Sequence, residues 1–424
     1  MELEKADIKP ESSTPKIQKV VEHLRNRTNY EKYYSPKLVS IGPIHHGEAN
    51  LKLGEKYKLM WASRYIKEIA ETTAYNLHRK IADKIEDLKG LFAEDVLALT
   101  GESLNGFGSL EEKLSWMLLV DGCSLLYILF FANSWVFRVM GIKTDEVVLV
   151  RMDVLLLENQ LPYLVLKLLW IWKFNEAQLM LIMQVFCVRH QLTDLSDDRA
   201  WSSIRDVMDI PIPHHLLDFM RNMILAKSSS KVEINLERRR MTTYKNIQDL
   251  RAVGIRLKSN RTQKLSDIDF VDGWFVAKLT LPLLIVDNTT AAFYLNLMAY
   301  EMCPDFENDY GICSFAFFMD SLIDHPEDVK ELRSSGVLLN SLGSDEEVAD
   351  LFNIICADLV PDMDIYEEVR YKMNNHYQNK CKTWLALGIH TYFSNPWAFI
   401  AFLAALFALV LTFIQTWFAI HPTR

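Results

Sequence analysis

The sequence lacks the motifs by which several large enzyme classes are recognised. It contains no Walker A loop, no G-x-G-x-x-G, no G-x-S-x-G, no H-E-x-x-H and no set of kinase motifs. Its six cysteines are scattered without a C-x-x-C pair, which indicates reduced, separately buried thiols rather than a disulfide framework or a zinc site. We therefore expect no metal and no cofactor, and we assign no catalytic residue.

Positive charge is also scarce over the chain as a whole. The formal net charge is -9 over 424 residues, which argues against a general nucleic-acid-binding protein. The N-terminal stretch "MELEKADIKPESSTPKIQ" is polar and has no apolar run, so no signal peptide is visible. Half of all residues are hydrophobic, however, and such a chain can bury a sizeable core.

Two long apolar segments invite opposite interpretations. Residues 397–420, "WAFIAFLAALFALVLTFIQTWFAI", carry no charge and are long enough to cross a bilayer, which takes about 20 apolar residues. Trp397 and Trp417 stand near its ends, where aromatic rings favour the membrane interface. Residues 114–131 contain Asp121, which would cost about 2.5 to 3.5 kcal/mol inside a bilayer. We predict a transmembrane helix at 397–420 and a buried core helix at 114–131.

The position of the predicted span suggests a topology. Only residues 421–424 follow it, which predicts insertion after translation as a tail anchor, with the main body in the cytosol. Lys380 and Lys382 precede the span and weakly favour the same orientation. A lumenal body stays open because of three N-x-T triplets, which begin at Asn26, Asn260 and Asn288. The expected partner is a lipid bilayer, either the plasma membrane or the endoplasmic reticulum.

Charge and hydropathy divide the rest of the chain. We expect a polar flexible leader at 1–29 and a helical body at 30–392, with lobes 30–226 and 265–392 joined by a basic connector, 227–264. The connector holds 11 Lys or Arg against 3 acidic residues. It is interpreted as a solvated link, or alternatively as a contact for anionic lipid or an acidic protein. The residues proposed for that contact are Arg238, Arg239 and Arg240.

Helical periodicity dominates the body. Apolar residues at steps of three and four predict one helix over about 52–88. A second helix is predicted to begin near Thr144 as its N-cap, to break near Pro162 and to restart beyond it. Ser344 and Glu347 have the spacing of a capping box at the start of another helix.

Only one part of the chain predicts β structure. Apolar residues alternate on both sides of Asp272-Gly273, a favoured hairpin turn, and "VGIRLK" just before could add a strand. The predicted fold is therefore mainly α, a helical body in two lobes with a β-hairpin or three-stranded meander at about 252–287, plus one C-terminal transmembrane helix.

Two pairs of histidines are candidate metal ligands. His45 and His46 follow a Gly-Pro turn, and His214 and His215 form a second pair. Adjacent residues point to opposite faces of a strand, and about 100° apart on a helix, so neither pair easily presents both rings to one ion. We therefore predict a hydrogen-bonded structural turn at His45 and His46.

Polar residues inside apolar runs are the other candidates. Glu158, Asn159 and Gln160 are either exposed or bonded to backbone groups freed by Pro162, because unbonded buried polar groups are costly. Asp320 and Asp324 beside His325 could perform acid–base chemistry. We favour a helix start after His325, at Pro326, with Gly336 at its end. With a large core, one membrane anchor and no recognisable catalytic set, the leading hypothesis is a membrane-tethered interaction protein, and the alternative is an unrecognised enzyme that uses Glu158, His45 or Asp320.

Taken together, several stretches resemble a plant-specific family catalogued as domain of unknown function 247. The matching segments are "VSIGPIHHG", "VDGCSLLYIL", "DVLLLENQLPYLVL", "IDFVDGWFVAKLTLPLLIVDNTTAAFYLNLMAYE", "DYGICSFAFFMDSLIDHPEDVKELRSSGVLLNSLGSDEEVADLFN" and "YFSNPWAFIAFLAALFALVLTFIQ". They occur in family order from about residue 36 to 416. Ile44 departs from the pattern, since an aromatic residue is common there.

The resemblance implies a mostly helical plant protein with one C-terminal transmembrane helix, and it supplies no catalytic residues. Some grass members are associated with self-incompatibility loci, so recognition or signalling through protein partners is the role that the family favours. The motif residues, expected to be structural, are Gly42, Pro43, His45, His46, Gly47, Asp121, Glu158, Asn159, Gln160, Pro162, Asn395, Pro396 and Trp397.

Overall fold

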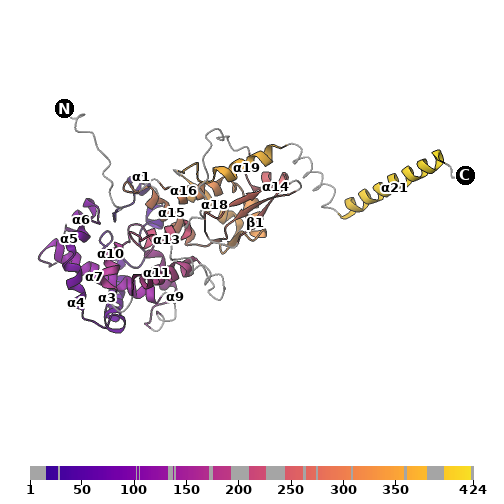
Figure 1. Cartoon of the computed structure of the whole chain (residues 1–424). Helices are drawn as coiled ribbons and strands as arrows, with labels where there is room; N and C mark the ends of the chain where they lie inside the picture. The colour runs from indigo at the N-terminus through magenta and orange to yellow at the C-terminus, as the bar shows by residue number, and fades with distance from the viewer. Residues whose placement is uncertain are drawn as a thin grey trace, which may run out of the picture.

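The structure is a computed structural model in which helices dominate and a small mixed sheet lies near the C-terminal end of the body (Figure 1). This agrees with the mainly α fold class. The residues that it describes are 16–26, 29–101, 103–104, 106–131, 137, 140–170, 175–191, 210–225, 244–260, 264–273, 276–306, 309–357, 361–379 and 396–421.

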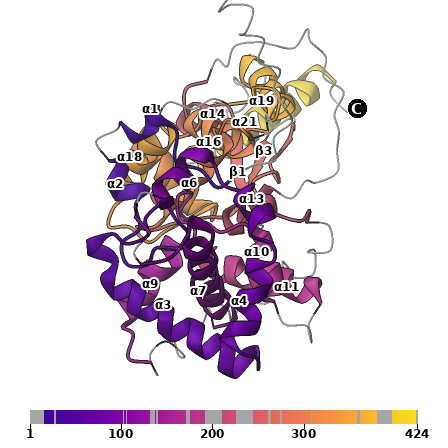
Figure 2. The same cartoon turned by 90° about the vertical axis from the view of Figure 1, so that its left-hand side faces the viewer.

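A first hydrophobic core is built around one long helix, α7 (Leu110–Phe130). Figure 2 shows α7 among helices α3, α4 and α10, which contact it. Because its side chains are buried almost throughout, the predicted core helix at 114–131 is confirmed. The helices in residues 16–225 are α1 (Glu22–Arg25), α2 (Tyr30–Tyr33), η2 (Ala49–Leu51), α3 (Lys52–Arg64), η3 (Tyr65–Ile69), α4 (Ala74–Ala82), α5 (Ile85–Lys89), α6 (Glu94–Gly101), α9 (Thr144–Asp153), α10 (Tyr163–Leu169), α11 (Glu176–Gln191) and α13 (Leu216–Leu225). Of these, α1 and α2 pack on the second core described next.

A second hydrophobic core surrounds helices α15, α16 and α18 and the sheet. Two helix starts in this half follow the prediction. α17 begins at Pro326, and Ser344 caps α18 by accepting a hydrogen bond from the Glu347 amide at 3.2 Å. The helices here are α14 (Ile247–Ala252), α15 (Thr290–Glu301), α16 (Gly311–Asp320), α17 (Pro326–Ser334), α18 (Asp345–Cys356) and α19 (Glu367–Gln378).

The single helix predicted over 52–88 is wrong. The chain ends α3 in a π-helical turn, η3, and leaves helical geometry at Glu71, whose φ is 47°. Thr73 then caps α4 by accepting from the Asn76 amide at 3.3 Å, and α5 follows after a further break. The apolar spacing continues across these breaks because both sides pack on the same core.

The second predicted helix ends earlier than expected. α9 stops at Asp153 rather than near Pro162, and residues 154–159 form turns and bends. Its N-cap is Lys143 rather than Thr144, since the Lys143 amide donates to the Glu146 carboxylate at 2.9 Å. The restart is confirmed, because α10 begins directly after Pro162.

The sheet contains the predicted hairpin but not the meander. β2 (Asp269–Val271) pairs antiparallel with β3 (Ala277–Leu281), which confirms the hairpin. β1 (Ile255–Ser259) is parallel to β3, and the strand order is β1-β3-β2, whereas a meander would be antiparallel throughout. A separate parallel pair joins β4 (Leu284–Val286) to β5 (Leu338–Asn340), a strand that the sequence did not predict.

Two segments expected to be solvated contribute to the cores where the structure describes them. Residues 244–260 of the expected connector form α14 and β1, with Ile247 and Ile255 buried in the second core. Residues 16–26 of the expected leader bury Ile17 in the first core and Leu24 in the second. The rest of both segments lies mostly outside the described residues.

The C-terminal helix α21 (Pro396–Ile420) stands apart from both cores (Figure 1). Its apolar window Ile400–Trp417 is 0% buried, whereas the only other helix long and apolar enough among the described residues, α7, is 89% buried. By length and composition, α21 could span a membrane.

Candidate functional site

The motifs "VSIGPIHHG" and "DVLLLENQLPYLVL" lie far apart in the chain, yet they form one buried polar cluster. The carboxylate of Asp153, at the end of α9, accepts hydrogen bonds from the amides of Lys37, Leu38 and Val39 at 2.9, 2.7 and 2.9 Å. These amides cannot pair within a helix or strand, because residues 37–41 belong to neither. Burial raises the pKa of Asp153 to about 6, and the three amides oppose that rise.

The next residues of the motif extend the same contact. Asn159 accepts from the Ile41 amide at 2.6 Å and donates to the carbonyl of Val39 at 2.9 Å. Gln160 donates to the Leu156 carbonyl at 2.8 Å and accepts from the Leu217 amide at 3.0 Å. Both side chains are buried and bonded to backbone groups, as predicted for one of their two alternatives.

Gly42 is required where the two segments touch. Its φ is +81°, a conformation that L side chains rarely adopt, and an added Cβ would lie 2.7 Å from the Gln160 carbonyl oxygen. Its amide donates to Asp121 at 2.8 Å, which ties the loop to α7. Pro43 is buried beside it, and Gly47, at φ +86°, closes the turn.

Asp121 forms an ion pair in the interior of the first core. Lys58 Nζ lies 2.6 Å from its Oδ1, and the two side chains are 0% and 1% exposed. Burial raises the pKa of Asp121, and Lys58 opposes the rise. Burial acts to lower the pKa of Lys58, but Asp121 and Glu55 outweigh it, so the net shift is upward and the amine stays charged.

Glu158 and His45 form the centre of the cluster. Glu158 accepts from the Val20 amide at 2.7 Å and from the Tyr30 hydroxyl at 2.6 Å. His45 Nε2 lies 3.1 Å from Glu158 Oε2, and His45 Nδ1 lies 2.6 Å from Glu48 Oε1. The guanidinium of Arg25 approaches Glu158 at 3.8 Å. Glu158 therefore joins the N-terminal segment, α2 and the His45 loop.

Glu158 and His45 each stabilise the charged form of the other. Burial acts to raise the pKa of Glu158, but the hydrogen bonds from His45, Tyr30 and Val20 outweigh it and hold the pKa below its ordinary value. Burial acts to lower the pKa of His45, but Glu158 and Glu48 outweigh it and raise the pKa. The ionised carboxylate and the imidazolium are therefore the favoured pair.

This arrangement leaves little room for acid–base catalysis. The side chain of Glu158 is 0% exposed, and its oxygens already face three donors, Val20, Tyr30 and His45. A general base must reach a substrate proton within hydrogen-bond distance. The geometry therefore favours a structural interpretation of the motif over a catalytic one.

The histidine pairs do not assemble a metal site in the part of the chain that the structure describes, where no group of three or more His, Cys, Asp or Glu side chains is arranged to hold a metal ion. His46 is partly exposed, and among the described residues it forms no ion pair with the carboxylates that contact His45. His214 is exposed, whereas burial lowers the pKa of His215 to about 4. His215 Nδ1 accepts from the Asp218 amide at 3.1 Å.

The carboxylate of Asp328 stabilises the start of α17. Asp328 accepts from the amides of Asp324 and His325 at 3.1 and 3.0 Å. Asp320 is exposed, and partial desolvation together with the nearby Asp324 raises its pKa. Asp324 lies 3.5 Å from His325 in an exposed pair.

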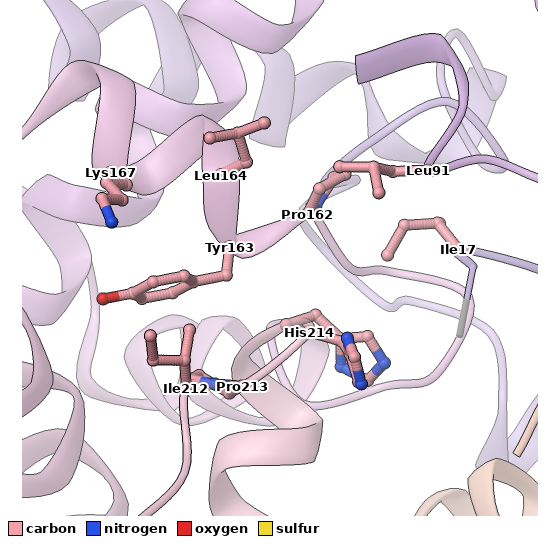
Figure 3. A pocket seen from close by; sticks show the side chains of 10 residues that line it. Ile17, Leu91, Pro162, Tyr163, Leu164, Lys167, Ile212, Pro213 and His214 are labelled. Carbon is pink, nitrogen blue, oxygen red and sulfur yellow. The ribbon is translucent and has the colours of Figure 1, made fainter. Parts of the chain in front are cut away.

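A cavity of about 290 Å³ lies where α10 meets the segment before α13 (Figure 3). Apolar side chains dominate its walls, with Tyr163 and Lys167 on one side and Ile212 on the other. Glu176 lies 2.8 Å from Lys167 Nζ and accepts from the Tyr163 hydroxyl at 3.2 Å. Ligand pockets usually measure about 300 to 1,000 Å³, so this cavity lies at the lower end of that range.

Sequence reasoning missed three polar groups that bind distant segments. Asn296 donates to the Tyr33 carbonyl and accepts from the Leu157 amide, both at 2.8 Å. Arg221 and Glu301 form a buried ion pair at 2.7 Å. Asn296 interrupts the apolar run "AAFYLNLMAYE", the same signal that singled out Asp121.

The remaining predicted residues lie elsewhere. Pro396 begins α21, and Trp397, 78% exposed, follows it. Asn395 and the arginines at 238–240 lie outside the described residues.

Comparisons with known proteins cover nearly the whole chain. The profile of a family described as plant protein of unknown function matches residues 17–411. A UPF0481 protein of Arabidopsis thaliana is 26% identical over 420 residues, which is 92% of this chain and 83% of the relative. A putative UPF0481 protein of the same plant is 26% identical over 174 residues, 41% of this chain and 32% of the relative. No solved structure matches.

Proposed function

The chain belongs to the plant protein family of unknown function whose profile spans residues 17–411, and from that premise we propose that it is a membrane-tethered interaction protein. The helical body presents surfaces to protein partners, and α21 holds it at a membrane. α21 is the observation that carries the proposal.

The dimensions and the surface of α21 suit a bilayer. Its 25 residues extend over about 37 Å at 1.5 Å each, against a hydrocarbon core of about 30 Å. It carries no charge, and its large apolar side chains are exposed, for example Phe407 at 67% and Leu409 at 69%. In water such a helix would expose far more apolar surface than a soluble protein normally tolerates.

The cysteines support a cytosolic body. Five of the six lie among the described residues, and each of these is a free thiol: Cys123, Cys187, Cys303, Cys313 and Cys356. Burial raises the pKa of Cys123, Cys187 and Cys356, so these thiols are unreactive. Unpaired buried thiols are typical of reducing compartments.

The polar cluster supports an interaction role over a catalytic one. Glu158 and His45 are held by contacts within the chain, and Asp320 forms no ion pair with any histidine, lysine or arginine that the structure describes. An enzyme that uses Glu158 would first have to expose it.

Fractionation of native plant tissue, followed by proximity labelling with the full chain, tests the proposal. We expect the protein to stay in membranes after alkaline extraction and to label a reproducible set of proteins. Release by alkali would overturn the tether. A purified activity without any reproducible partner would overturn the interaction role.

The orientation of the helical body relative to the membrane can be tested separately at Asn26 and Asn288, two exposed asparagines of the N-x-T triplets. A cytosolic body predicts that glycosidase treatment leaves the mass of the native protein unchanged. A glycosidase-sensitive mass would place the body in the lumen, and Asn26→Gln and Asn288→Gln variants would show which asparagine carries the glycan.

A further inference from the structure

Two arginines from neighbouring helices, α9 and α11, lie in contact. Arg151, near the end of α9, donates a guanidinium hydrogen bond to the backbone carbonyl of Arg189, in the last turn of α11. Neither side chain forms an ion pair with any carboxylate that the structure describes. Two positively charged guanidinium groups therefore lie close together, and both side chains are partly buried.

Each of the two guanidinium groups has a buried donor that lacks an acceptor among the described residues. The Nε atoms of Arg151 and Arg189 are buried, and neither has a hydrogen-bond partner among the described residues. A guanidinium carries five N–H donors in a planar fork. A buried donor without an acceptor costs about 1 to 3 kcal/mol, and more when it is charged. The arrangement is costly as it stands, and an anion would relieve it.

The two guanidinium groups carry a combined charge of +2. Burial lowers the pKa of Arg151, and the charge of Arg189 lowers it further. Burial also lowers the pKa of His190 to about 4, with a contribution from Arg151, so the imidazole is neutral near pH 7. Asp287 is the acid that acts on His190, and its Oδ1 already accepts from Thr289 and Thr290.

We propose that the guanidinium groups of Arg151 and Arg189 bind the phosphate group of a phosphomonoester where α9 meets the end of α11. A phosphomonoester carries a charge of about -1.5 to -2 near pH 7, which matches two guanidinium groups, whereas a carboxylate neutralises only one. Paired forks also suit the oxygens of a phosphate. The group belongs to a soluble compound or to a lipid headgroup.

Thermal unfolding of the full chain in phosphatidylcholine nanodiscs tests the site, with inorganic phosphate as the probe. We expect phosphate to raise the unfolding midpoint above that in chloride at equal ionic strength, in a saturable way. Arg189→Gln is expected to weaken phosphate binding at least tenfold. It keeps the backbone carbonyl that Arg151 binds, so folding is preserved. Arg189→Lys keeps the charge but loses the fork, so an intermediate loss is expected.

Arg256→Gln is the matched control, because Arg256 is exposed on β1 and the variant changes the net charge equally. It is expected to keep the full phosphate effect. Adding a phosphatidylinositol phosphate to the nanodiscs distinguishes the sources. A headgroup ligand raises the midpoint without added phosphate, whereas a soluble ligand acts only from solution. If neither probe raises the midpoint, or if Arg189→Gln keeps the full effect, the site does not exist.

Discussion

Helices α7 and α21 are both long and apolar, yet they end in different surroundings. The apolar window of α7 is 89% buried, and that of α21 is 0% buried. α7 carries Asp121, Gly122 and Ser124 near its middle, whereas α21 carries no charge. Each of the three has a partner or neighbour inside the protein, Lys58, Leu169 and the Lys58 carbonyl respectively.

The difference shows what a polar residue within an apolar run means. The charged Asp121 carboxylate would oppose insertion into lipid, but in this protein interior a cation and a backbone amide stabilise it. Gly122 allows α10 to approach α7 closely. An apolar helix without such residues has nothing that requires a protein neighbour. The comparison predicts how each helix responds to substitution.

The largest expected effect comes from Asp121→Ala. It leaves Lys58 buried without its nearest counter-charge and the Gly42 amide without an acceptor. We expect the free energy of unfolding to fall by about 3 to 5 kcal/mol, measured by denaturant titration of the full chain in detergent.

Two controls sharpen that result. Asp83→Ala removes an exposed carboxylate and is expected to change stability little. Lys58→Met combined with Asp121→Leu removes both charges and is expected to be less destabilising than Asp121→Ala alone. If the double variant is the worse of the two, the ion pair is not the cause.

For α21 the corresponding change is Leu409→Arg. A central arginine opposes membrane insertion by about 2.5 to 3.5 kcal/mol, so we expect part of the protein to leave the membrane fraction during alkaline extraction. Leu339→Arg, at a 50% exposed leucine of β5, is the matched control and is expected to stay with the membrane. Equal release of both variants would contradict the role of α21.

Close packing gives a smaller effect at Gly122. An added Cβ would lie 2.5 Å from Leu169 Cδ1 and 2.9 Å from Val165 Cγ1. We expect Gly122→Ala to lower the free energy of unfolding by about 1 to 3 kcal/mol. Gly101→Ala, where a Cβ meets nothing within 4 Å, is expected to be neutral. Equal stability of the two variants would show that α10 can move away.

The smallest effect concerns pH. Because the pKa of His45 is raised in the folded chain, its contribution is fully present below the ordinary pKa of about 6.5 and is lost as pH rises through the folded value. Stability is therefore expected to fall as pH rises through that window, and His45→Gln is expected to flatten the slope. α21 has no titratable group, so membrane retention is expected to be constant over the same range. A pH profile unchanged by His45→Gln would refute the assignment.

Sequence reasoning succeeded where the signal is local. Ser344 with Glu347 and the proline at 326 mark helix starts within one turn, and Asp121 excludes a membrane span by its own chemistry. The resemblance to the plant family is likewise carried by contiguous segments, and the match over residues 17–411 confirms it.

Sequence reasoning failed where a residue is bound by another that lies far away in the sequence. Glu158 is bound by Val20 and Tyr30, which are 138 and 128 residues away, and nothing in their local sequence indicates the contact. The strand β5 is three residues long and exists only because β4 lies beside it. The break at Glu71 was hidden because the apolar spacing continues across it.

Asn296 has a consequence for the order in which the protein can fold. Its amide group joins the carbonyl of Tyr33 to the amide of Leu157, and the first of these contacts spans 263 residues. On a ribosome the N-terminal half must wait for α15 to emerge before its own loops are fully bonded. Contacts of such separation slow folding. A fragment that ends between the two cores would keep α7 but lose the hydrogen bonds of Asn296. We therefore expect that neither half folds fully when it is expressed without the other.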